Sequence, residues 1–88
     1  MKHVLVWSKH ATVFCGFVPD DQALTDRTMR LVDAKMAIRW GTTRGILELA
    51  HTGPNEHSKI GLPATVTIQD ITHCAELSPE ASEAWRNA

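Results

Sequence analysis

The chain contains no tyrosine and only two cysteines, and it has no apolar run long enough to cross a membrane. No Cys-x-x-Cys pair occurs and the five histidines are scattered, which disfavours a structural metal site. The apolar run near the N-terminus is too short for a signal peptide, so we expect a cytoplasmic protein in which Cys15 and Cys74 stay reduced. A disulfide scaffold and a membrane partner are therefore not expected.

The 88 residues also lack a strong charge of either sign, because 9 Lys and Arg oppose 10 Asp and Glu. A net charge of −1 gives no global positive field for nucleic acid, so an anion site requires a local cluster of cations. The 43% hydrophobic and 22% charged fractions are typical of a folded domain. We expect a single domain over residues 1–88, with a core so small that a homo-oligomer would stabilise it.

What the chain does have is a strand pattern that runs directly into a small basic turn. Apolar residues stand at 32, 34, 36, 38 and 40, with Ala37 as the only lapse, and this alternation is typical of a half-buried strand. The pattern stops at Gly41, and Thr43 is placed to cap a short helix. That helix should end by Thr52, because the Gly-Pro pair that follows favours a helix end.

Alternation and β-branched residues predict the other strands. The expected strands cover residues 3–7, 12–18, about 28–40, 64–68 and 71–75, with a short edge segment over 57–62. The apolar alternation changes from odd to even positions between Leu31 and Val32, which indicates a bulge or a sharp bend. A second change in the alternation, at Gln69-Asp70, indicates a corner or a hairpin. Ser78 and Pro79 are typical of a helix start.

These elements predict a mostly-β member of the α+β class. A small antiparallel barrel of about five strands, SH3-like or Sm-like, accommodates them with one short inserted helix and a C-terminal helix.

The segment from Leu31 to Pro54, with Ile-Arg-Trp-Gly-Thr-Thr at residues 38–43, resembles a family of small, uncharacterised proteins of tailed bacteriophages and prophages. The first strand, the second strand and the strand over residues 71–74 also fit, so the resemblance covers nearly the whole chain. It implies a phage origin and carries no catalytic assignment. By analogy it favours a non-enzymatic inhibitor or sponge that acts on host defence.

The basic turn is the candidate ligand-binding site. Arg39 and Arg44 supply positive charge, and Thr42 and Thr43 supply hydroxyl groups. The backbone N–H groups of a helix start would also face an anion. Trp40 is placed to contact a nucleobase by stacking. The alternative is structural: Thr43 only caps the helix, Trp40 fills the core, and both arginines are solvated.

Two further tryptophans are candidates for a subunit interface. Trp7 lies at a strand end and Trp85 on the terminal helix, where partial exposure is expected, and exposed indoles anchor interfaces. No motif for a nucleophile or a phosphate loop is present, and the strand neighbours His73 and Cys74 point to opposite faces. We therefore expect no enzyme, no cofactor and no metal.

The sequence thus favours a non-enzymatic, oligomeric phage accessory protein. It would bind and sequester an anionic ligand, such as a nucleotide signal of host defence. One alternative is a protein-binding inhibitor that blocks a host protein through an apolar patch around Trp7 and Trp85. Another is a Sm-like RNA binder, which the near-neutral charge disfavours.

Overall fold

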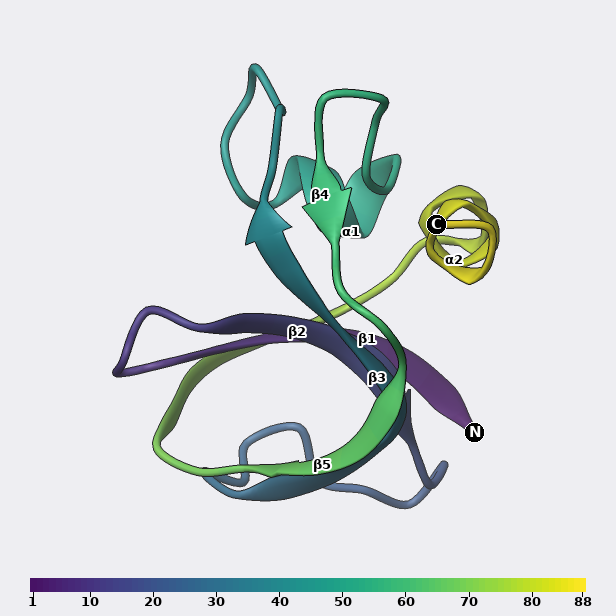
Figure 1. The fold of residues 1–88 in the computed structure, drawn as a ribbon. Helices are drawn as coiled ribbons and strands as arrows, with labels where there is room; N and C mark the ends of the chain where they lie inside the picture. Colours follow the sequence, from purple (N-terminus) through teal and green to yellow (C-terminus); the bar gives the residue numbers. More distant parts are fainter.

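The computed structural model describes residues 1–88 as a strongly curved antiparallel sheet with two short helices near one end (Figure 1). The strands are β1 (Lys2–Ser8), β2 (Val13–Val18), β3 (Met29–Arg39), β4 (Lys59–Ile60), β5 (Ala64–Ile68) and β6 (Ile71–Glu76). The helices are α1 (Glu48–His51) and α2 (Pro79–Arg86). The strand order is β4-β3-β2-β1-β6, and β5 also pairs with β3. The expected mostly-β class is confirmed, with six strands rather than about five.

The segment that joins β5 to β6 is a corner and not a hairpin. Strand β5 pairs with β3 and strand β6 pairs with β1, so the chain passes from one edge of the sheet to the other at this point. Asp70 has a positive φ of 56° at the corner. No ladder joins β5 to β6, so the sheet is open and the expected barrel is not closed.

Strand β3 contains the bulge that its sequence predicts. Between its pairings with Cys15 and Phe17 of β2, strand β3 has one residue more than β2, opposite Gly16. Asp33 lies in this bulge and has a φ of 50°. A Cβ atom on Gly16 would lie 2.9 Å from Cβ of Leu31, so only glycine lets the two strands approach this closely. As a result, Leu31 and Ala34 pack into the same cluster although they are three residues apart.

The second half of β3 corrects one expectation. Ala37, which the alternation treats as a lapse, is a core residue with 3% exposure, whereas Ile38 is 51% exposed. The physical reason is that apolar clusters cover both faces of the sheet, so one continuous alternation does not describe its strands.

The two clusters divide the core between the faces of the sheet. The first comprises Val4, Val6, Val18, Met29, Leu31, Ala34, Ile68 and Ile71. The second joins the other face to the helices and comprises Leu5, Val13, Cys15, Ala37, Leu49, Ala50, Ala81 and Trp85. Cys74 packs against the first cluster, so the two thiols lie on opposite faces and cannot form a disulfide.

Helix α2 begins as predicted, because the Ser78 hydroxyl accepts a hydrogen bond from the backbone N–H of Ala81 at 3.1 Å. Trp85, near its other end, corrects a second expectation. The partial exposure expected for this indole is wrong, because Trp85 is 1% exposed and its Nε1 donates to the carbonyl of Leu49 at 2.9 Å. An interface through Trp85 therefore lacks its exposed anchor. Neither helix has the length or the apolar character to span a membrane.

Candidate functional site

The predicted basic turn is present, but it does not lead directly into a helix. Thr42 donates its hydroxyl hydrogen bond to the carbonyl of Gly45 at 2.8 Å, and Gly45 has a positive φ of 91°. Helix α1 begins only at Glu48 and spans four residues, without a side-chain cap. The expected cap at Thr43 is therefore wrong, because the left-handed Gly45 interrupts the helical path. The predicted end at Thr52 is confirmed.

The structure does not bring the candidate residues of the turn into one site. Arg39 is exposed at the end of β3 and lines none of the four cavities. Arg44 lines a shallow groove of about 290 Å³ along α1, beside Leu47 and Glu48. Trp40 is half-buried and packs against the second core cluster. The turn thus offers solvated cations rather than an enclosed site.

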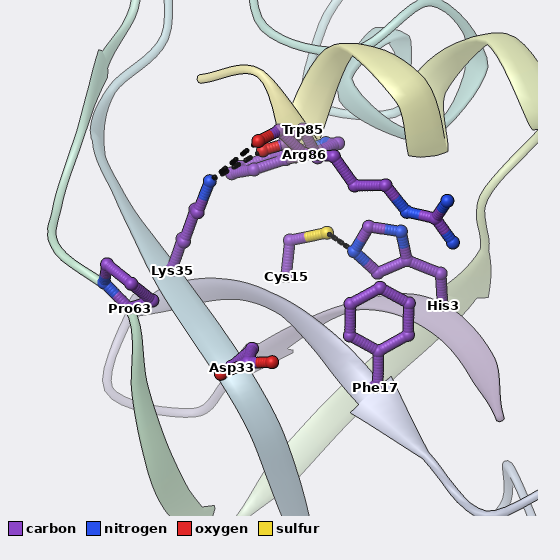
Figure 2. A pocket seen from close by; sticks show the side chains of 8 residues that line it. All are labelled: His3, Cys15, Phe17, Asp33, Lys35, Pro63, Trp85 and Arg86. Carbon is purple, nitrogen blue, oxygen red and sulfur yellow. Dashed lines mark hydrogen bonds between the residues drawn. The ribbon is translucent and has the colours of Figure 1, made fainter.

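A more enclosed cavity lies where β1, β2 and β3 meet the C-terminal end of α2 (Figure 2). Its volume is about 200 Å³. It is lined by His3, Cys15, Phe17, Asp33, Lys35, Pro63, Trp85 and Arg86. Of these residues the sequence singled out only Trp85 as a candidate, and for a different role.

Strand register places the polar side chains of the cavity on one face. His3 pairs with Phe17 across β1 and β2, and Cys15 stands two residues along from Phe17. His3 and Cys15 are therefore diagonal neighbours on the face that α2 covers. Lys35 pairs with Cys15 from β3, which extends the row to a third strand.

The ring of His3 is held on three sides. Its Nε2 lies 3.2 Å from Sγ of Cys15, and its Nδ1 lies 2.8 Å from Oγ of Ser82 on α2. The ring also stacks on Phe17, with centroids 4.0 Å apart and an interplanar angle of 11°. These contacts leave the imidazole one orientation, with Nε2 directed at the sulfur (Figure 2).

The protonation states follow from burial. Burial, with Arg86 and Lys35 nearby, lowers the pKa of His3 to about 4, so the ring is neutral at neutral pH. Burial also raises the pKa of the Cys15 thiol far above its ordinary value. A neutral imidazole carries a single N–H. The consistent arrangement is that the thiol donates to Nε2 and that Nδ1–H donates to Ser82.

Neither cation of the cavity forms an ion pair with an Asp or Glu side chain. The ion pairs of the structure involve the N-terminus, His10 and His57, and no lysine or arginine side chain. Nζ of Lys35 donates to backbone oxygen atoms at and just beyond the end of α2, at 2.8 Å to Trp85 and at 2.9 Å to Ala88, the last residue of the sequence. The guanidinium of Arg86 lies over the ring of Phe17, 5.5 Å from its centroid, and forms no hydrogen bond within the protein.

A family model described as "Domain of unknown function (DUF6948)" matches residues 1–85. The chain belongs to this DUF6948 family. No curated protein and no solved structure matches it. The description of DUF6948 names no activity and no source, so the phage origin that the resemblance implies stays a prediction.

One sequence signal in this DUF6948 member pointed toward the cavity. His3 and Leu5 share a phase in the first strand, and Cys15 and Phe17 share a phase in the second. A tight hairpin sets the register between them, so their faces follow from the loop over residues 8–11. The contribution of Ser82 and Arg86 depends on how α2 packs, and no local pattern encodes that.

Proposed function

We propose that this chain is a non-enzymatic binding protein that holds a small anion in the cavity beside His3, Lys35 and Arg86. One observation supports the proposal most: the cavity is lined by two cations that no carboxylate side chain neutralises. Asp33 is the only acidic residue in the lining, and its side chain is exposed. A guanidinium that has no hydrogen-bond partner within the protein is well suited to a carboxylate or a phosphate, which it contacts through two parallel hydrogen bonds.

The size of the cavity restricts the ligand. A volume of about 200 Å³ is below the roughly 300–1,000 Å³ typical of sites for drug-sized molecules. The cavity therefore suits a small carboxylate, inorganic phosphate, or the phosphate end of a larger molecule whose remainder stays outside. A nucleotide signal of host defence could bind in this way, with its phosphate end in the cavity. The proposal therefore includes sequestration of such a signal.

The open sheet also supports a proposal about the fold family. We propose that the sheet is a variant of the SH3-like or Sm-like architecture, opened between β5 and β6. The bulge at Asp33 and the corner at Asp70 support this reading, because both bend the sheet toward closure. Trp7, half-buried and stacked on His73 at 4.7 Å, remains available as an anchor for a homo-oligomer.

Titration calorimetry tests the binding proposal with a panel of inorganic phosphate, acetate, succinate and mononucleotides. At least one anion should bind, and added salt should weaken the binding because it screens the charges. Arg86→Ala should abolish the binding, whereas the matched control Arg44→Ala should preserve it. Absence of binding across the panel would contradict the proposal, as would binding that is lost in the Arg44 variant and kept in the Arg86 variant.

A further inference from the structure

We propose that Cys15 is the nucleophile of a covalent capture site in this cavity, with His3 as its base and a small carboxylate-bearing carbon electrophile as its ligand. The inference rests on the proposed function, because the same cations would orient the ligand. Capture consumes one thiol per ligand and involves no turnover, so it extends binding without making the chain an enzyme.

Three elements bring the reacting groups together. Cys15 comes from β2, His3 from β1 and Ser82 from α2. The sulfur lies 3.2 Å from Nε2, and Nδ1 lies 2.8 Å from the Ser82 hydroxyl. This is the order of nucleophile, base and orienting group that activates a weak nucleophile. Cys15 is thus part of an oriented pair that lines a cavity (Figure 2).

The burial of Cys15 decides how it would react. Burial holds the thiol in its neutral form, so a free thiolate is scarce at neutral pH. The proton must therefore leave as the bond to carbon forms, and the neutral His3 ring is the base within reach. Because Cys15 is 1% exposed, a reagent reaches the sulfur only through the cavity.

The reaction balances without a further reagent for an α,β-unsaturated carboxylate. The sulfur of Cys15 forms a bond to the β-carbon, and the carbon–carbon π bond breaks. The thiol proton passes to Nε2 of His3 and from there to the α-carbon, so His3 ends neutral. The carboxylate stays ionised throughout and lies against the cations Lys35 and Arg86 that line the cavity.

Cys74 provides an internal control in the same chain. It is half-buried on β6, more exposed than Cys15, and packs against the opposite face of the sheet. No hydrogen bond joins its thiol to a histidine, and the negative charge of Glu76 acts on it. Exposure alone therefore predicts that Cys74 reacts first, whereas a base and a cationic cavity predict that Cys15 does.

Competitive labelling of the full chain distinguishes these expectations. The protein is treated at neutral pH with iodoacetate or with neutral iodoacetamide, and mass spectrometry follows each cysteine over time. In either reaction a sulfur–carbon bond forms, the carbon–iodine bond breaks, iodide leaves and the thiol proton passes to His3. Iodoacetate should label Cys15 at least about tenfold faster than Cys74, since a positioned base contributes this much or more. Iodoacetamide should reduce that preference, because it lacks the charge that the cavity attracts.

Variants assign the effect to the base. His3→Gln should lower the rate at Cys15 about tenfold or more and leave the rate at Cys74 unchanged. Ser82→Ala should lower it less, and it supplies the same comparison if the His3 variant does not fold. Arg44→Ala is the matched control and should change neither rate.

Failure of capture and failure of binding give different results. Faster labelling of Cys74 by both reagents would overturn capture, and the proposed anion site would still stand if phosphate binding depends on Arg86. Equal preference for Cys15 with both reagents would instead overturn the carboxylate as the recognised group. A rate at Cys15 that does not depend on His3 would overturn the assignment of the base.

Discussion

Nε2 of His3 lies 3.2 Å from the sulfur of Cys15, with the two residues on neighbouring antiparallel strands. The contact joins a base whose pKa is lowered to a thiol whose pKa is raised, so both groups are neutral at neutral pH. A neutral pair is easier to bury than an ion pair, and it keeps the positive charge of the cavity on Lys35 and Arg86.

The first prediction concerns stability against pH. The pKa of His3 falls from 6.5 in the unfolded chain to about 4 in the folded one, so the unfolded state binds the proton more readily. The contribution of His3 to the free energy of unfolding is therefore fully present above about pH 6.5, and it is lost as the pH falls toward 4. Urea unfolding measured at several pH values should show this loss for the wild type. His3→Gln should remove the share of this pH-dependent loss that is due to His3. A pH profile that is the same in the variant and the wild type would contradict the lowered pKa of His3.

The second prediction concerns the bulge in β3. Gly16→Ala should destabilise the fold by about 1–3 kcal/mol, because the new Cβ overlaps a packed side chain and a backbone atom. Gly61→Ala is the matched control, since its nearest neighbour would lie at an ordinary 3.6 Å. That control should stay within about 0.5 kcal/mol of the wild type. Thermal and urea unfolding report both values, and equal effects would refute close strand approach at Gly16.

The third prediction separates the two tryptophans that the sequence treats alike. Trp85→Ala should cost about 3–5 kcal/mol, because it empties the second core cluster and leaves the Leu49 carbonyl without its donor. Such a loss is a large fraction of the total stability of a small domain. Trp7→Ala should cost much less, because Trp7 is only half-buried. Chemical denaturation monitored by circular dichroism measures both, and a comparable loss at Trp7 would contradict the packing.

Much of the fold could be predicted because local signals encode it. The strand over 64–68 matches β5, and the cap at Ser78 matches the start of α2. The bulge between Leu31 and Ala34 followed from a switch in alternation. These features depend on residues that are close in sequence, where alternation and capping act directly.

The failures share a physical cause, which is packing between distant segments. Ala37 is buried because clusters form on both faces of the sheet, and Trp85 is buried because α2 packs against α1. The sequence did not predict the cationic cavity for the same reason, because the cavity joins β1 and β2 to the far end of the chain. The conspicuous arginines of the turn are neighbours in sequence, yet no cavity encloses both.

In the proposed site an anion binds beside His3 and Arg86, and not at the turn over residues 39–45. A titration of ¹⁵N-labelled protein with inorganic phosphate, followed by two-dimensional NMR, tests it most directly. Binding in the cavity should produce saturable shifts of the backbone amide signals of His3, Cys15 and Phe17, and these shifts should be lost in Arg86→Ala. Shifts confined to residues 39–45, or no saturable shift in any signal, would contradict it.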